Sequence, residues 1–139
     1  MIFDPTTEHG ARAQARLATE KVAWLTTVTA AGQPQSMPVW FLWSDGELLV
    51  YSDRRARRNA NVAANPKVSI HLADRAGDDI VVIEGEALID PDQPAVPDNP
   101  AYLAKYGASI DATLGGPAQM AETYSVAIRI RPTRGIAIG

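Results

Sequence analysis

Residues 22–52 read VAWLTTVTAAGQPQSMPVWFLWSDGELLVYS, and this stretch decides what kind of fold the chain adopts. β-Branched and aromatic residues dominate 22–29, 35–43 and 47–52, and such residues favour strands. The two connections, AAGQP and SDG, are short and rich in turn-forming residues. We therefore predict three consecutive strands in an antiparallel meander, of which the first two form a hairpin.

The rest of the chain adds strands and short helices to this unit. Asp4 and Pro5 suit the start of a helix over 5–20, and the alternation of apolar and polar residues in KVSIHLA predicts a half-buried strand. Gly85 indicates a bulge or a close backbone approach in a later strand. The other predicted elements are a short helix over 54–64, a strand over 79–89, a loop over 90–100, helices over 101–110 and 117–124, and one or two strands over 125–139.

This order of elements predicts a mainly β fold with peripheral helices (α+β): a small antiparallel β-barrel in one domain spanning 1–139. The regular alternation of strand and helix that a doubly wound sheet needs is missing.

The sequence contains no cysteine, so disulfides, thiolate metal sites and a cysteine nucleophile are excluded. No apolar run reaches the roughly 20 residues of a membrane span, and the first residues lack a signal-peptide pattern. We expect a cytoplasmic protein with no membrane partner.

Charge is distributed unevenly along the chain. Residues 51–67 carry five basic side chains against one acidic side chain, whereas 74–98 carry eight acidic side chains against one arginine. The formal net charge of the whole chain is −3. Because general nucleic-acid binders are usually basic overall, this local positive block favours a small anionic group as its partner and predicts no nucleic acid.

The block of arginines could hold a phosphate. If 54–64 is helical, Arg54, Arg58 and Asn61 fall on one stripe of the helix. The helix would then begin just after Ser52, so its backbone amides would add to the guanidinium groups and to the Ser52 hydroxyl. A second stripe of Ala56, Ala60 and Ala63 would pack on the barrel. The alternative is a solvated basic face, or ion pairs with the acidic region 74–98.

The run QSMPVWFLW, residues 35–43, carries a second indication of a site. Pro38 cannot donate to a strand ladder, so it interrupts pairing or lies at a sheet edge and leaves the backbone of Val39 and Trp40 free for another partner, such as a planar heterocycle. Alternation places Trp40 and Trp43 on opposite faces of one strand.

Three motifs in this chain resemble those of the split-barrel flavin and deazaflavin oxidoreductases, the family that includes pyridoxamine 5′-phosphate oxidase. They are G-x-P-x-x-x-P-V-W-F, D-G-x-L and S-x(4)-R-[RK]-x-x-N-[VIL]-x-x-N-P-x-V. The residues that fit are Gly32, Pro34, Pro38, Val39, Trp40, Phe41, Asp45, Gly46, Leu48, Ser52, Arg57, Arg58, Asn61, Val62, Asn65, Pro66 and Val68. The likeness continues weakly through VIEGEALI, YLAKYG and IRIRPTRG.

The resemblance implies a homodimeric split β-barrel with two cofactor sites at the subunit interface. It implies that the phosphate-bearing tail lies against Ser52, Arg57, Arg58 and Asn61, and that the ring system lies along residues 35–40. Arg54 and Arg55 exceed the minimal motif, and their added charge suits the longer anionic tail of the deazaflavin coenzyme F-420. The predicted cofactor-binding residues are Gln35, Ser36, Pro38, Val39, Trp40, Ser52, Arg54, Arg57, Arg58 and Asn61.

The activity expected from this resemblance is hydride transfer between F-420 and a small organic substrate, with no catalytic side chain required because the cofactor performs the chemistry. An FMN-dependent oxidoreductase and a non-catalytic flavin-binding protein remain alternatives. Hydrolase, nucleotide-phosphate and Rossmann motifs are absent from the sequence. His9 and His71 are too isolated to predict a metal site. Glu84 and Glu86 are explained by exposed alternation on a strand, and we assign no role to Tyr102, Tyr106 and Met120.

Overall fold

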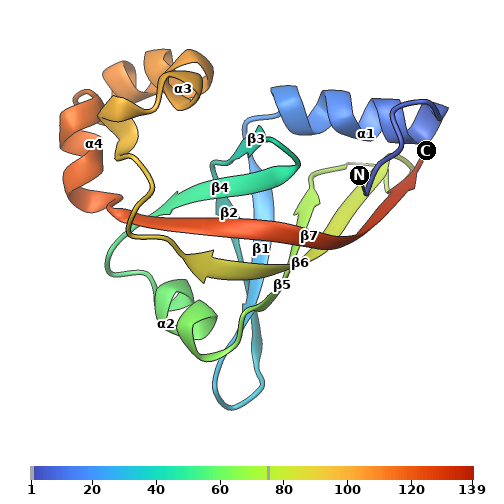
Figure 1. Ribbon diagram of the computed structural model, residues 1–139, viewed down its shortest axis with the longest axis horizontal. Helices are drawn as coiled ribbons and strands as arrows, with labels where there is room; N and C mark the ends of the chain where they lie inside the picture. The colour runs from blue at the N-terminus through green and yellow to red at the C-terminus, as the bar shows by residue number, and fades with distance from the viewer. Residues whose placement is uncertain (1, 75) are drawn as a thin grey trace.

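The computed structural model describes residues 2–74 and 76–139, and in this part of the chain seven strands form a single curled sheet with helices at its ends (Figure 1). All pairs of neighbouring strands are antiparallel. The elements are α1 (Glu8–Thr19), β1 (Ala23–Val28), β2 (Pro34–Val39), β3 (Leu42–Ser44), β4 (Glu47–Ser52), α2 (Arg57–Ala64), β5 (Lys67–Leu72), β6 (Ile80–Ile89), a 3-10 turn (Val96–Asp98), α3 (Pro100–Thr113), α4 (Pro117–Thr123) and β7 (Val126–Ile138).

The predicted hairpin of the first two strands is confirmed. β1 and β2 pair in register from Ala23 opposite Val39 to Val28 opposite Pro34. Gly32 lies in the turn with a φ of 88°, a conformation that glycine adopts without strain. β2 is an edge strand, so the prediction that Pro38 lies at an edge is also confirmed.

The rest of the predicted meander is confirmed only in part: Leu42–Ser44 pair with β4 across the SDG turn, but the predicted strand 35–43 is split into β2 and β3. The strand order is β2-β1-β5-β6-β7-β4-β3, so β2 and β3 lie at opposite ends of the sheet. The run 35–43 breaks between the two strands because the backbone of Phe41 bonds to α3 instead of to a strand. Its N–H donates to the Tyr106 hydroxyl at 2.9 Å, and its carbonyl accepts from Lys105 Nζ at 2.7 Å. Trp40 therefore lies in the connection after β2 whereas Trp43 lies in β3, so the alternation argument does not apply to them.

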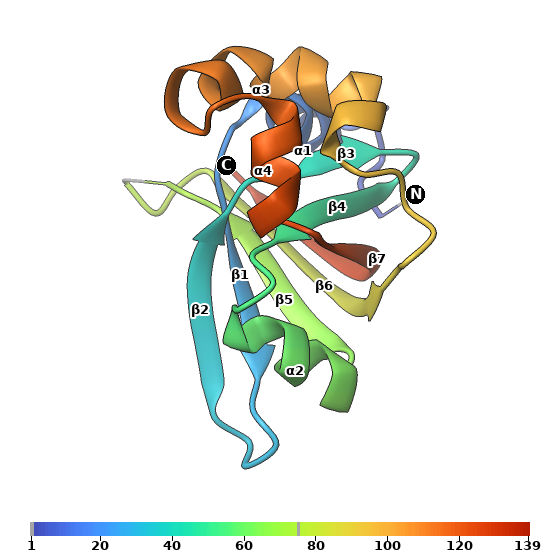
Figure 2. The same ribbon diagram turned by 90° about the vertical axis from the view of Figure 1, so that its left-hand side faces the viewer.

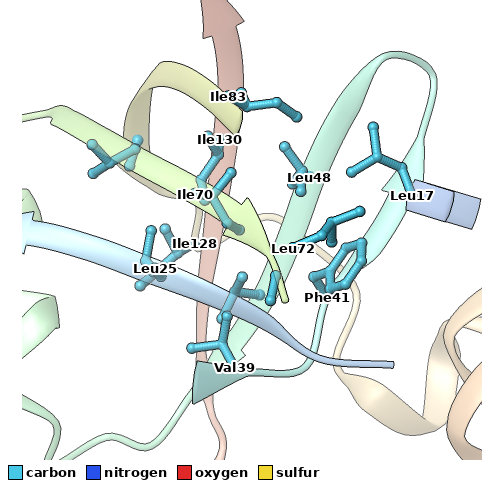
Figure 3. Packing of buried hydrophobic residues seen from close by; sticks show 14 of the residues in the cluster. Leu17, Leu25, Val39, Phe41, Leu48, Ile70, Leu72, Ile83, Ile128 and Ile130 are labelled. Atoms are coloured by element: carbon cyan, nitrogen blue, oxygen red, sulfur yellow. The ribbon is translucent and has the colours of Figure 1, made fainter. Parts of the chain in front are cut away.

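The interior of the curled sheet is filled by aliphatic side chains, which we call the barrel core. Figure 3 shows Leu25, Ile70 and Ile130, from three different strands, pointing into this interior. Each exposes at most 2% of its surface, and burial of such a side chain contributes about 1.5–3 kcal/mol. The other fully buried members of the cluster include Leu17, Phe41, Leu48, Val50, Ile83 and Ile128.

The strands predicted over 67–73 and 79–89 are confirmed as β5 and β6. Both predictions for Gly85 hold: the register between β6 and β7 shifts at Glu84/Gly85, and a Cβ at Gly85 would lie 2.7 Å from the Arg131 carbonyl oxygen. The C-terminal segment is one continuous strand, β7. Glu84 and Glu86 lie on β6, next to β7, and the Glu86 carboxylate forms an ion pair with Arg131 of β7 at 2.9 Å.

The first helix begins later than predicted. Thr7, not Asp4, caps α1, because the Thr7 side chain accepts a hydrogen bond from the N–H of Gly10. The Asp4 carboxylate instead accepts from the N–H and the hydroxyl of Thr6, which forms a turn ahead of the helix. Within segments 2–74 and 76–139, no helix has the length and apolar character needed to cross a bilayer.

A second group of buried side chains lies outside the barrel core, where α3 and α4 pack on β4 and β7. We call it the tyrosine cluster: Leu49, Tyr51, Val96, Tyr102, Tyr106, Ile110, Met120 and Ala127. The helices predicted over 101–110 and 117–124 are confirmed as α3 and α4. The tyrosine cluster also forms one wall of the cavity described next.

Candidate functional site

The protein contains a cavity of about 640 Å³ beside the tyrosine cluster. Most of its lining residues come from β2, the connection from β4 to α2, and the helices α3 and α4 with the segments that follow them, elements that can be followed in Figure 2. Its lining residues are Val22, Met37, Pro38, Val39, Trp40, Tyr51, Asp53, Arg55, Ala56, Arg58, Tyr102, Thr113, Leu114, Met120 and Tyr124. Small-molecule sites in proteins have volumes of about 300–1,000 Å³, so this cavity is large enough for an organic ligand.

Arg58 supplies the positive charge in the wall of the cavity formed by α2. Its Nε donates to the Ser52 hydroxyl oxygen at 2.9 Å, and Ser52 is fully buried. Burial lowers the pKa of Arg58, and the nearby Asp53 carboxylate opposes this shift. Among the described residues, the two terminal nitrogens of Arg58 have no hydrogen-bond partner. The guanidinium is thus held in place with its fork available to an anion.

The helix that carries Arg58 starts three residues later than predicted. Asp53 causes this delay, because its carbonyl accepts from the N–H of Ala56 and its carboxylate from the N–H of Arg55 at 2.9 Å, which holds 53–56 in a turn. α2 therefore begins at Arg57, and the predicted stripe from Arg54 through Arg58 does not form.

The arginines of this block have different surroundings. Arg54 donates to the carbonyl of Glu122 in α4 at 2.9 Å, and Arg55 pairs with Asp53 at 3.4 Å. Arg57 is exposed on the first turn of α2. In the described part of the chain, none of these arginines forms an ion pair with the acidic region 74–98, so that alternative is not supported.

The packing face of α2 also differs from the prediction. Ala60 and Ala63 are exposed, whereas Asn61 and Val62 are buried. Asn61 Nδ2 donates to Thr27 Oγ1 and to Gln35 Oε1, both at 3.0 Å. A polar amide therefore joins α2 to the β1–β2 hairpin.

Three predicted residues of the strand wall line the cavity together: Pro38, Val39 and Trp40. The Trp40 ring stacks on Tyr106, with ring centroids 4.6 Å apart and an interplanar angle of 3°. Gln35 and Ser36, farther along β2, do not line it; Ser36 forms a hydrogen bond with Thr26 at 2.6 Å. The structure thus joins Pro38, Val39, Trp40 and Arg58 around one cavity, and places Gln35, Ser52 and Asn61 behind them.

Sequence reasoning missed the wall formed by α3 and α4. Tyr102, Leu114, Met120 and Tyr124 line the cavity, and helical spacing of aromatic residues is typical of ordinary packing. Asp53 and Tyr51 were also missed, although both adjoin the predicted Ser52. The cavity therefore has a charged end at Asp53, Arg55 and Arg58, and an apolar, aromatic end at Trp40, Tyr102 and Met120. Such a site can hold a planar group that carries an anionic extension.

A curled antiparallel half-barrel with peripheral helices and a cavity of this kind defines a split barrel of the flavin-binding type. The chain belongs to the pyridoxamine 5′-phosphate oxidase family, whose model matches residues 10–139. The predicted family and fold class are confirmed.

Solved structures support the same fold. The chain is similar to General Stress Protein 26 from Bacillus anthracis, with 24% identity, 92% of each chain covered and a TM-score of 0.70. It is similar to an F-420 reductase with 27% identity, 88% of this chain and 94% of that chain covered, and a TM-score of 0.68. HutZ, a heme storage protein from Vibrio cholerae, shares 16% identity over 96% of each chain, with a TM-score of 0.65. No curated protein matches the sequence.

Proposed function

We propose that this protein is an oxidoreductase that binds the deazaflavin F-420 and transfers a hydride between it and a small organic substrate. The observation that carries the proposal is Arg58, a half-buried guanidinium that faces a cavity with its terminal nitrogens unpartnered among the described residues. The similarity to an F-420 reductase supports the choice of cofactor.

The residues around the cavity fit such a group. Arg58 suits an anionic tail. Arg55 also lines the cavity but pairs with Asp53, and Arg57 adds positive charge at the surface. Pro38, Val39 and Trp40 offer a flat wall on an edge strand for a ring system. Three further predicted residues have a supporting role. The Ser52 hydroxyl holds Arg58 by a hydrogen bond, and Asn61 holds α2 against β2 by a hydrogen bond to Gln35.

The cofactor would supply the redox chemistry, and the chain would orient it and exclude water. Leu114, just after α3, and Met120, in α4, add apolar side chains to the lining of the cavity. An apolar environment of this kind strengthens the interaction of Arg58 with an anion, because less water screens the charges. No proton-transferring side chain is needed for this role.

Fluorescence titration with F-420, and with FMN in parallel, tests the proposal. Loss of a charge-assisted hydrogen bond costs about 2 kcal/mol, so we expect Arg58→Ala to weaken F-420 binding about 30-fold. Arg57→Ala should weaken it less, because Arg57 is exposed. Arg12→Ala is the matched control, because Arg12 lies on α1 and pairs with Asp79 away from the cavity. Equal F-420 affinity in the wild type and Arg58→Ala would exclude the anchoring role.

The same titration separates the alternatives. Saturable binding of FMN but not of F-420, or a yellow purified protein, would indicate an FMN enzyme. Tight binding of either cofactor without turnover of a panel of enones and quinones would indicate a protein that stores or carries the cofactor.

We further propose that the protein is a homodimer whose partner completes the cavity. Met37 and Val22 line the cavity yet expose 56% and 40% of their surfaces, and Trp24 on the adjoining outer face exposes 37%. Met37 lies on the edge strand β2, Trp24 on the neighbouring strand β1, and Val22 just before β1; exposed apolar side chains beside a sheet edge favour contact with another chain. Light scattering after gel filtration should give twice 14.9 kDa, and Met37→Asp should lower this mass. A monomeric wild type at 50 µM would refute the dimer.

A further inference from the structure

The three tyrosines of the tyrosine cluster differ in the hydrogen bonds that their hydroxyls form. The Tyr51 hydroxyl donates to the Pro94 carbonyl at 2.6 Å and accepts from Asn99 Nδ2 at 3.0 Å. The Tyr106 hydroxyl accepts from the Phe41 N–H at 2.9 Å and donates to the Lys21 carbonyl at 2.7 Å. The Tyr102 hydroxyl is buried and has no partner among the described residues.

This unpartnered hydroxyl needs an explanation, because a buried polar group without a hydrogen bond is destabilising. The Tyr102 ring is fully buried and packs well: it meets Tyr51 edge-on with centroids 4.8 Å apart, and Tyr106 at 4.9 Å. Phenylalanine would make the same ring contacts. The hydroxyl therefore adds nothing to the packing that the structure shows.

Tyr102 is also a lining residue of the cavity, at its apolar end with Trp40, Leu114 and Met120. Burial raises the pKa of Tyr102, so the hydroxyl stays protonated at physiological pH and can serve as a donor. Because Tyr102 exposes none of its surface, a ligand in the cavity reaches this hydroxyl only when a covering side chain moves, and Met120, which lines the same cavity, is flexible enough to do so. A neutral donor among apolar groups recognises an uncharged oxygen acceptor, whereas the charged end at Arg58 recognises an anion.

We propose that the Tyr102 hydroxyl donates a hydrogen bond to the carbonyl oxygen of the substrate, and that the substrate is a small apolar ketone, enone or quinone bound at this end of the cavity. One part of this inference rests on the proposed function, namely that the molecule bound beside Tyr102 is a substrate that is reduced. The hydrogen bond from the Tyr102 hydroxyl does not depend on it. A site built around one such hydrogen bond rejects analogues that lack the oxygen.

Binding of 1-tetralone and tetralin, which differ by a carbonyl in place of a methylene, tests this inference without any cofactor. Ligand-detected NMR should show that the wild type prefers 1-tetralone about fivefold, the contribution of one neutral hydrogen bond. In Tyr102→Phe the preference should fall to about one. The melting temperature of Tyr102→Phe should equal or exceed that of the wild type, because an unpartnered hydroxyl has been removed.

Tyr106→Phe is the matched control for stability. It removes a hydroxyl that is bonded inside the protein, so its melting temperature should fall by about 5 °C. A similar fall in Tyr102→Phe would show that the Tyr102 hydroxyl already has an internal partner, and would overturn the inference. So would equal binding of the two ligands by the wild type, binding of neither, or a preference that survives in Tyr102→Phe. Failure of F-420 and FMN titration would refute the proposed function but leave this comparison intact.

Discussion

The barrel core and the tyrosine cluster are both buried, but they differ in chemistry. The barrel core consists of aliphatic side chains together with Phe3 and Phe41, and its buried members have no side-chain polar atoms to satisfy. The tyrosine cluster contains three hydroxyls, of which two bond to backbone carbonyls and one has no partner in the described structure. The first region can be stabilised by burial alone, whereas the second depends on individual hydrogen bonds.

Because of this difference, the two regions contribute differently to the stability of the protein and to the binding of a ligand. The cavity adjoins the tyrosine cluster and takes Tyr51, Tyr102 and Met120 from it. Substitutions in the barrel core should therefore change the free energy of unfolding, and substitutions in the tyrosine cluster should change both folding and the shape of the cavity.

Ile130→Ala should have the largest effect, because Ile130 is fully buried in the barrel core. We expect a loss of about 3 kcal/mol in the free energy of unfolding, measured by urea denaturation, from lost burial and the cavity left behind. Ile138→Ala on the same strand is the matched control, since Ile138 exposes 56% of its surface, and it should change stability by less than about 0.5 kcal/mol. Equal losses in both variants would contradict the assignment of the barrel core.

Asn99→Ala should have a smaller effect that arises in the tyrosine cluster. The Asn99 carbonyl oxygen Oδ1 caps α3 by accepting from the Tyr102 N–H at 3.1 Å, and Nδ2 donates to the Tyr51 hydroxyl. Loss of both bonds should cost about 2 kcal/mol. Asn99→Ser can retain the cap but not the bond to Tyr51, so about half of the loss should remain. If Ser and Ala are equivalent in denaturant titrations, the cap contributes nothing.

Lys105 should give the smallest effect, seen as a dependence of stability on pH. Burial, with a smaller contribution from Lys21, lowers the pKa of Lys105 from 10.5 to about 8. Between pH 8 and 10.5 the unfolded chain binds more protons than the folded protein, so stability rises with pH across this window. The ammonium donates to the Phe41 carbonyl and lies 3.8 Å from the Phe41 ring centre. Both contacts favour the charged form and limit the rise.

Lys105→Met should lack this rise. The free energy of unfolding should be measured for the wild type and for Lys105→Met at intervals from pH 7.5 to 10.5. The difference between the two curves isolates Lys105, because the other titrating groups are the same in both proteins. The difference should stay below about 1 kcal/mol, because Lys105 is only half buried. Parallel curves would show that the Lys105 ammonium is as stable in the protein as in water.

Local patterns predicted the parts of the fold that depend on neighbouring residues. The alternation of Val68, Ile70 and Leu72 predicted β5, and Gly85 marked the bulge in β6. The pairing of β4 with β7 could not be predicted in this way, since nothing in 47–52 identifies a partner nearly 80 residues away. The meander was the simplest assumption for strands with short connections; both of its turns form, but the contacts of Phe41 with α3 split its second strand into β2 and β3.

The site was predictable to a similar extent. A motif in the arginine block pointed to Arg58, and Pro38 pointed to the strand wall, because each residue type has a specific chemical consequence. The delayed start of α2 depends on hydrogen bonds of Asp53 that compete with the helix. Tyr102 could not be distinguished from Tyr106 by sequence, because the partners of the Tyr106 hydroxyl lie 65 and 85 positions away.

The position of β7 has a consequence for how the protein assembles in a cell. β7 lies between β6 and β4 in the sheet, and it is the strand that joins the β2-β1-β5-β6 group to the β4-β3 pair. Until β7 has been synthesised, the edges of β6 and β4 that it covers are open on the nascent chain, in addition to the outer edges of β2 and β3, and can pair with neighbouring polypeptides. Assembly of the seven-stranded sheet must therefore follow synthesis of residues 126–138, and ribosome-bound intermediates should depend on chaperones more than the released protein does.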